Sequence, residues 1–310
     1  MSDALISSPG GVISVLCAVA AFWFFVQQVT GWTLFQYVPP LLFIYATPVF
    51  LNNLGVIPSS SPVYSGLSSF VLPAFIVLML IKVNVPAAVR VMGKGVMVML
   101  MGTIGVVVGC IVSYVIVHRW LDPDAWKGFG ALAGSWIGGT GNMAATSEML
   151  GTPPEQFGLA VLADNVVYLV WLPILLGSKN FADKFNAWAK VPEDRIRMME
   201  MAADELHEEE KAPLMREYIY LAAIAIAVTW IATSIAPWLF DRTVALSAGL
   251  ATALNETTWR ILLITTIALI LSTTPVAKLP NSTALGTAMI YVFVAGMGAR
   301  ASIEGFGQAP

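Results

Sequence analysis

The sequence from Ala133 to Thr146 reads AGSWIGGTGNMAAT, a run of glycines and hydroxyl residues between two long apolar segments. Four of the eight residues from 134 to 141 are glycines, and each glycine costs roughly 1 kcal/mol relative to alanine in a helix interior. Lipid offers no hydrogen bond to a bare peptide group, so broken helices occur at membrane depth only where they line a cavity or are covered by protein. We therefore predict a membrane helix over 130–150 that is interrupted at this run.

The composition places the chain in a membrane. Hydrophobic residues make up 57% of its 310 residues and charged residues 11%, whereas soluble domains carry about 25% charged residues. The mean hydropathy is +0.77, and the long apolar runs predict helices rather than a β-barrel. We expect an all-α, polytopic transmembrane helical bundle in the inner or plasma membrane. Its partner is the lipid bilayer, and the lack of basic clusters with interleaved aromatics excludes nucleic acid.

Three regions follow from the distribution of charge. Residues 1–177 form a first membrane repeat that includes the broken helix, 178–216 form a charged cytoplasmic linker, and 217–310 form a partial second repeat. The first apolar run lacks the basic residues that precede the core of a signal peptide, so we interpret it as a helix. Within the linker, Pro192-Glu193-Asp194 predicts a helix start. The predicted spans are 11–28, 36–54, 66–83, 95–117, 130–150, 157–177, 217–238, 258–275 and 284–299, with a shorter apolar piece at 243–255.

A shift of about 218 residues brings the two membrane regions into register, which indicates an internal duplication of the kind common in secondary transporters. The matched pairs are Pro62 with Pro280, Leu67 with Leu285, Phe75 with Phe293, Met79 with Met297 and Lys82 with Arg300. The sequence stops just after the counterpart of the third span, so we expect an incomplete second repeat. Either the chain is a fragment of a longer protein, or another chain completes its site.

The basic residues leave the topology open. Lysine and arginine prefer cytoplasmic loops, and they occur both in the loop with Lys82, Arg90 and Lys94 and in the linker. Both segments can lie inside only if the 130–150 segment turns back instead of crossing the membrane. If it crosses, one basic segment faces outward.

Asp164 lies in the apolar span 157–177, which is otherwise without charge between these bounds. A carboxylate there costs about 2.5–3.5 kcal/mol on insertion scales, so an intramembrane acid is a functional hypothesis by default. We expect ion coupling, to sodium or to protons, at Asp164 together with Asn165 and Asn142. No other metal or cofactor is expected. The alternative is that Asp164 simply lies near the membrane surface.

The interrupted run itself offers hydroxyls, an amide and free backbone groups, and unwound segments hold the substrate or coupling ion in transporters. Close helix packing through small residues is the alternative, since Gly134, Gly138 and Asn142 recur at a spacing of four. We treat Glu148 as a solvated or capping acid, and Asn52 and Asn53 as helix caps. The predicted substrate-binding residues are Ser135, Gly138, Gly139, Thr140, Gly141, Asn142 and Thr146.

Enzyme chemistry finds little support in these residues. Ser135 lacks the Gly-x-Ser-x-Gly elbow of a serine nucleophile, and no zinc-protease or nucleotide-binding motif occurs. Cys17 and Cys110 are isolated in apolar runs and are interpreted as free thiols. His118 and His207 have no ligand partners at suitable spacing. We predict no catalytic residue. Without an ATP-binding element, transport is driven by ion gradients or is passive, and a non-transporting scaffold or an intramembrane enzyme is the alternative.

The run from Leu132 to Ala145 resembles the signature of the YjcL-like integral membrane proteins, a family of unknown function. The Tyr37–Leu42 segment, the helix end at Asn53–Pro58 and the pair Trp126-Lys127 are similar to the same family pattern. Members of that family are generally longer and carry a second glycine-rich motif, which this sequence lacks.

More distantly, the family is similar to the cation:proton antiporter and anion transporter superfamily, which includes glutamate:sodium symporters. The resemblance implies an unwound helix followed by a helix that bears an acidic residue, and Asp164 after residues 138–142 matches that order. It also implies a homodimeric, elevator-type carrier. A small organic anion or amino acid is the expected substrate, because backbone amides and hydroxyls suit a carboxylate.

Overall fold

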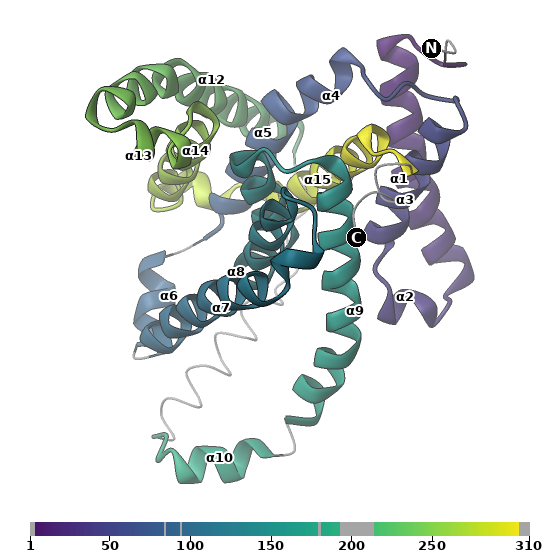
Figure 1. Ribbon diagram of the computed structural model, residues 1–310. Coiled ribbons are helices and arrows are strands. Elements are labelled where there is room, and N and C mark those ends of the chain that lie inside the picture. Colours follow the sequence, from purple (N-terminus) through teal and green to yellow (C-terminus); the bar gives the residue numbers. More distant parts are fainter. Residues whose placement is uncertain (1–3, 84, 94, 179–180, 193–213, 304–310) are drawn as a thin grey trace.

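The fold is made of helices. The computed structural model describes residues 4–83, 85–93, 95–178, 181–192 and 214–303, and every regular element in these ranges is helical (Figure 1). Among the described residues, six helices are long and apolar enough to cross a membrane. The prediction of an all-α polytopic bundle is therefore confirmed.

The elements follow the chain in two groups. The first group is α1 (Pro9–Thr30), α2 (Leu34–Tyr37), α3 (Pro40–Asn53), α4 (Pro62–Gly66), the π-helix η1 (Leu67–Val71), α5 (Leu72–Leu80), α6 (Val85–Met92), α7 (Gly95–Val117), the 3-10 helix η2 (His118–Trp120), α8 (Ala125–Leu150), α9 (Pro154–Ser178) and α10 (Ala182–Trp188). The second group is α12 (Met215–Leu246), α13 (Ala248–Ala253), α14 (Glu256–Leu271), the 3-10 helix η4 (Pro275–Lys278) and α15 (Ser282–Arg300).

Proline and serine set where several helices begin. Pro9, Pro40 and Pro62 occupy the first turn of their helices, where the missing N–H would have had no intrahelical partner and the fixed φ suits the helix. The hydroxyls of Ser8 and Ser61 accept hydrogen bonds from backbone N–H groups of the helices that follow. These local signals fix the starts of α1, α3 and α4.

The predicted span 36–54 is wrong as a single helix. Pro39 has φ −59° and ψ 148°, an extended conformation that the residue before a proline favours, and it separates α2 from α3. The span predicted at 66–83 begins earlier, at Pro62, and contains the π-helix η1 in its middle. The shorter apolar piece at 243–255 is divided between the end of α12 and the short helix α13.

Helices α5 and α15 pack against each other at the centre (Figure 1), and each also packs against helices of the other group. α15 packs on α3 and α1, whereas α5 packs on α14 and α12. α15 and α3 approach each other closely, since a Cβ atom on Gly298 would collide with the backbone carbonyl of Tyr45. Fully buried side chains such as Val77 on α5 and Val294 on α15 fill the centre. The duplication stays a prediction, and this reciprocal packing supports it.

Helix α8 is interrupted, as the sequence predicts. Gly138 has φ −146° and ψ 15°, and Gly139 has φ 77° and ψ −174°. The second pair of angles lies in a region that is essentially restricted to glycine. The break therefore falls inside the glycine run, at its two adjacent glycines.

The two arms of α8 then lie side by side. The Asn142 side chain donates from Nδ2 to the carbonyl of Gly134 over 2.9 Å, although eight residues separate them. Residues eight apart in a straight helix are about 12 Å apart along its axis. Near the other end, the Thr152 hydroxyl donates to the carbonyl of Lys127 over 3.4 Å, a pair that a straight helix would hold about 38 Å apart. The segment therefore turns back on itself as a helical hairpin.

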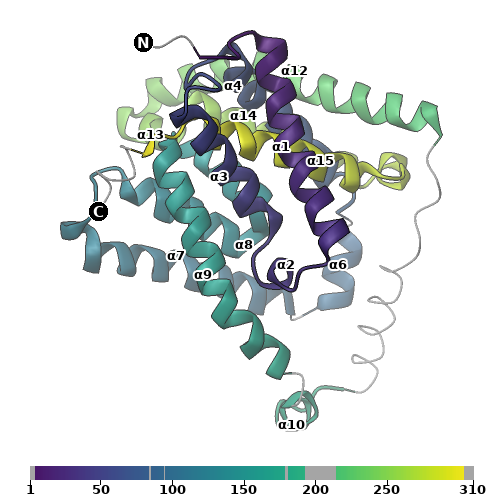
Figure 2. The same ribbon diagram turned by 90° about the vertical axis from the view of Figure 1, so that its right-hand side faces the viewer.

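Because α8 is a hairpin, the chain leaves α8 on the same side of the molecule from which it entered. As a consequence, α6, which precedes α7, and α10, which follows α9, belong to the same side of the molecule. Figure 2 shows both of them toward the lower right, whereas the N and C marks lie toward the left. The two basic segments on either side of α7–α9 can thus share one face.

Part of the predicted linker is helical. α10 spans Ala182–Trp188, and the chain is described again from residue 214, just before α12. The predicted helix start at Pro192-Glu193-Asp194 falls at the edge of the described residues, and His207 lies outside them.

Candidate functional site

Asp164 of α9 lies against the first arm of the hairpin. The hydroxyl of Ser135 donates to Oδ2 of Asp164 over 3.1 Å. The ring of Trp136 packs edge-on against that of Trp171, with 6.3 Å between centroids. The bond between Ser135 and Asp164 joins two residues that the sequence analysis selects for different roles, one for the substrate and one for the ion.

The remaining residues of the glycine-rich run differ in how exposed they are to solvent. Gly138, Gly139 and Asn142 are exposed at the tip, whereas Thr140 and Gly141 are half-buried. The second arm lies close to α5, since a Cβ atom on Gly141 would run into the ring of Phe75. The tip thus carries polar groups at the surface of the described chain.

Packing between the two arms also uses members of the run. The Asn142 amide is bonded to the Gly134 carbonyl, and a Cβ atom on Gly134 would lie 2.7 Å from Oγ1 of Thr146. Cavity lining and close packing were the alternatives for this segment. The geometry gives Gly134, Asn142 and Thr146 a packing role between the arms. At the tip, Gly138 also lies against the Asn142 side chain, whereas the Cβ position of Gly139 is open.

The side chain of Asn165 does not face the hairpin together with that of Asp164. Its side chain is 7% exposed, and Nδ2 donates to the carbonyl of Val161 within the same helix over 2.7 Å. Successive helix residues point about 100° apart, and only Asp164 faces the hairpin arm here.

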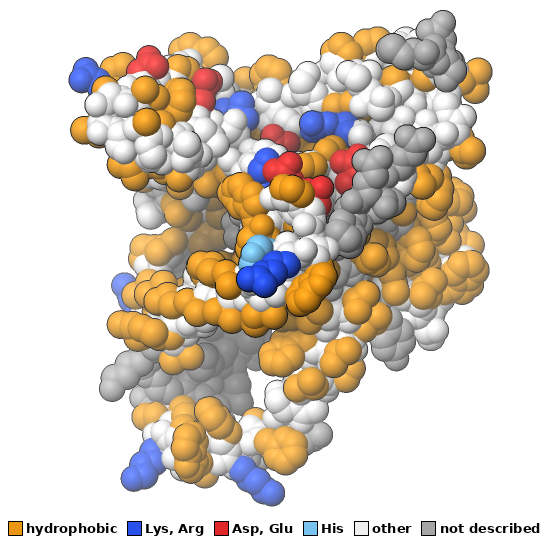
Figure 3. Space-filling model, viewed as in Figure 1, with side chains coloured by type: hydrophobic (Ala, Val, Ile, Leu, Met, Phe, Trp, Pro, Cys, Tyr) orange, Lys and Arg blue, Asp and Glu red, His pale blue; other side chains and the backbone are white. Residues whose placement is uncertain are grey.

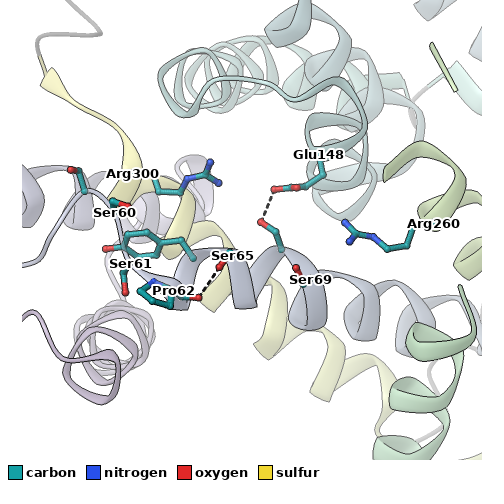
Figure 4. A pocket seen from close by; sticks show the side chains of 11 residues that line it. Ser60, Ser61, Pro62, Ser65, Ser69, Glu148, Arg260 and Arg300 are labelled. Carbon is teal, nitrogen blue, oxygen red and sulfur yellow. Dashed lines mark hydrogen bonds between the residues drawn. The ribbon is translucent and has the colours of Figure 1, made fainter. Parts of the chain in front are cut away.

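A second polar site, which the sequence analysis did not anticipate, is a cavity of about 630 Å³ (Figure 4). It lies where α4, η1, the end of α8, the start of α14 and the end of α15 meet. We call it the serine–arginine cavity. Its lining residues are Ser59, Ser60, Ser61, Pro62, Tyr64, Ser65, Ser68, Ser69, Glu148, Arg260 and Arg300.

Glu148 occupies this cavity instead of capping a helix in open water. The hydroxyl of Ser68 donates to Oε1 of Glu148 over 2.8 Å, across 80 residues of sequence. Ser68 belongs to the π-helix η1, and single π-helical turns recur at functional sites because they redirect side chains. Glu148 is half-buried, and its bond to Ser68 gives it a place in this cavity that the sequence did not indicate.

Both arginines of the cavity are open to a ligand. Nε of Arg260 is buried and makes no hydrogen bond within the described part of the chain. Nη1 of Arg300 has a long contact of 3.8 Å with Sδ of Met297. Among the described residues, neither guanidinium forms an ion pair with a carboxylate. The cavity therefore holds two positive charges and one negative charge.

A signal for this cavity was present in the sequence. Arg260 is a charged residue inside the predicted apolar span 258–275, so the rule that selects Asp164 also selects Arg260. The serines and Glu148 carry no such signal, because only the fold brings them to Arg260.

Asn52 and Asn53 do more than end α3. Nδ2 of Asn52 donates to the carbonyl of Ala301 over 3.1 Å, and Oδ1 of Asn53 accepts from the backbone N–H of Ile303 over 3.0 Å. These bonds fasten the end of α15 to α3 and thereby hold Arg300 near the cavity.

The described residues contain no group of three or more metal-ligating His, Cys, Asp or Glu side chains. A sodium site at Asp164 would have to draw on hydroxyl and backbone oxygens. Cys17 and Cys110 are free thiols, as predicted.

The comparisons with known proteins agree with the resemblance that the sequence carries. The family described as "Protein of unknown function (DUF819)" matches residues 14–310. Over 125 residues the chain is 32% identical to the uncharacterized membrane protein YjcL of Bacillus subtilis (strain 168), an alignment that covers 40% of this chain and 31% of that protein. No solved structure matches the chain significantly. Together with the six apolar helices found among the described residues, these matches identify a multi-pass integral membrane protein.

Proposed function

This chain belongs to the DUF819 family, and we propose that it is an ion-coupled secondary transporter of a small organic anion or amino acid. One observation carries the proposal, namely the broken hairpin of α8 with an acidic side chain of α9 beside it. Secondary transporters place substrate and coupling ions at such interruptions, where backbone groups are freed from helical bonding.

Asp164 and Ser135 supply oxygen ligands of the kind that a sodium ion takes. The carboxylate has one hydroxyl partner at 3.1 Å, and a carboxylate can accept about four hydrogen bonds or ligand contacts in total. The carbonyls at the end of the first arm of α8 lie within one turn of Ser135 and lose their helical partners at the break. Sodium or a proton bound at Asp164 would neutralise a carboxylate that is costly to keep charged in a membrane.

In this proposal the tip of the hairpin takes part in coupling. A side-chain bond from Asn142 to Gly134 joins the arms near the tip, and no atom lies within 4 Å of the Cβ position of Gly139. Binding of an ion or a solute that bridges the tip and α9 would stabilise one arrangement over another, which is the requirement for coupling. The resemblance to the antiporter and anion transporter superfamily suggests a homodimeric, elevator-like carrier.

The hairpin also gives the carrier an orientation. Because α8 turns back, α6 and α10 belong to one side of the molecule (Figure 2), and these helices carry Arg90 and Lys184. The tendency of lysine and arginine toward cytoplasmic loops puts that face inside. The serine–arginine cavity follows α3, on the other face, and would open outward.

The test of coupling uses the purified full chain in proteoliposomes that contain a sodium-sensitive and a pH-sensitive dye. A mixture of amino acids and dicarboxylates is added outside under an inward ion gradient. Solute-dependent entry of sodium or protons is expected for the wild type and is expected to be lost in Asp164→Asn. Asp241→Asn is the matched control, because Asp241 is an exposed carboxylate on α12, away from the hairpin.

Two results would reject this function. Coupled ion entry in Asp164→Asn equal to that of the wild type would remove Asp164 from the mechanism. A folded wild type that moves neither ion with any solute of the mixture would leave a non-transporting membrane protein as the better description.

A further inference from the structure

We infer that the serine–arginine cavity binds a small solute that carries two carboxylates and one ammonium group. The inference names the ligand class of the proposed carrier. The inference rests on the proposed function only for the transport of the solute across the membrane. Binding to the cavity can be tested without transport.

The size and lining of the cavity suit a metabolite. Its volume of about 630 Å³ falls within the range of roughly 300–1,000 Å³ typical of small-molecule sites. Six of its eleven lining residues are serines, whose hydroxyls both donate and accept hydrogen bonds. Figure 3 shows a face with many hydrophobic side chains and a smaller number of acidic and basic ones. The cavity brings three charged side chains and six serine hydroxyl groups together.

The arginines account for the two carboxylates. A guanidinium presents a planar fork of donors that matches a carboxylate with two parallel hydrogen bonds. Nε of Arg260 is buried without a partner among the described residues, and a buried unpaired donor is unfavourable until a ligand accepts from it. In Figure 4 the guanidinium ends of Arg260 and Arg300 lie on opposite sides of Glu148. Two separate carboxylates can therefore each take one arginine.

Glu148 accounts for the ammonium group. One of its oxygens accepts a hydrogen bond from Ser68, which leaves most of its acceptor capacity open. A solute with two carboxylates and no cation would bring a third negative charge beside Glu148. An ammonium group in that place replaces repulsion by a charge-assisted hydrogen bond, and the ligand then matches the two positive charges and one negative charge of the cavity.

The test measures binding to the purified full chain in lipid nanodiscs by titration calorimetry at low ionic strength. The probes are L-glutamate, L-aspartate, glutarate without an ammonium group, and 4-aminobutyrate with a single carboxylate. One of the two amino dicarboxylates is expected to bind more tightly than either incomplete probe. Arg260→Gln and Arg300→Gln are each expected to weaken it by roughly tenfold to a hundredfold, because each removes a charge-assisted pair.

The substitution Glu148→Gln tests whether Glu148 recognises the ammonium group of the ligand or only supports the structure of the cavity. It is expected to weaken the amino dicarboxylate and at the same time to tighten glutarate, because it removes the repulsion; a merely misfolded site would lose both. Arg260→Lys keeps the charge and should retain part of the affinity. Arg242→Gln is the control, since Arg242 stacks on Trp238 at 5.4 Å and is not part of the cavity lining.

Absence of binding by both L-glutamate and L-aspartate to a monodisperse wild type would overturn the inference, as would binding that neither arginine substitution weakens. These failures differ from failure of the proposed carrier. Ion-coupled entry with no binding of these probes would reject the ligand class alone, and binding without any ion movement would reject the carrier alone.

Discussion

Replacing Gly139 by alanine tests the turn on which the hairpin depends. The residue has φ 77° and ψ −174°, and a residue other than glycine held in this region costs about 1–3 kcal/mol. An added Cβ atom would meet nothing within 4 Å, so the cost is backbone strain without steric overlap. Alanine also restricts the unfolded chain, which returns about 0.4–1 kcal/mol. We expect Gly139→Ala to lower the free energy of unfolding by roughly 1–2 kcal/mol.

The measurement is equilibrium unfolding of the purified chain in mixed detergent and SDS micelles. Gly105→Ala provides a matched control, because Gly105 lies in the middle of α7 and its Cβ position is also open. There the same substitution should raise the free energy of unfolding by about 0.4–1 kcal/mol, since alanine fits the helix and restricts the unfolded chain. The two substitutions should therefore act in opposite directions. Equal effects at both positions would show that Gly139 is helical and that α8 has no such turn.

Three further predictions concern packing and orientation. Gly141→Ala should destabilise the chain by about 1–3 kcal/mol, because its Cβ atom would overlap the ring of Phe75, and a double-mutant cycle with Phe75→Leu should recover most of the loss; additive effects would contradict the contact. Tyr45→Phe should lower the free energy of unfolding by about 1–3 kcal/mol, because the buried hydroxyl donates over 2.6 Å to the carbonyl of the first residue of α9, and an unchanged unfolding curve would exclude that bond. In a background without the native cysteines, Ser60→Cys should react with an impermeant maleimide in intact cells and Arg90→Cys only after permeabilisation; the reverse pattern would invert the proposed orientation.

The position of the break was predictable because glycine acts locally. Two adjacent glycines in an apolar span weaken a helix whatever surrounds them, and the non-helical angles fall on those two residues. The choice of Asp164 as a candidate site residue has a similarly local basis, since the cost of a charge in lipid depends mainly on its depth. The same reasoning, applied to Arg260, would have pointed to the second site.

The return of the second arm of α8 was not predictable. Whether the chain continues or reverses after Gly139 depends on contacts beyond the break, such as the bond from Asn142 to Gly134 and the fit of Gly141 against Phe75. The basic residues left both crossing and turning back open, and the sequence favoured cavity lining by the small residues, with close packing as the alternative.

The sequence by itself determined that this protein is helical, that it lies in a membrane, where one of its helices breaks and which acid follows the break. These properties depend on the length of apolar runs and on single residues, because lipid penalises every unpaired peptide group and every charge. The tertiary structure alone decided that Ser135 meets Asp164 and that Glu148 and two arginines share a cavity with six serines. Such meetings depend on how helices far apart in the chain pack against one another, and packing is set by the shapes of all contacting side chains together.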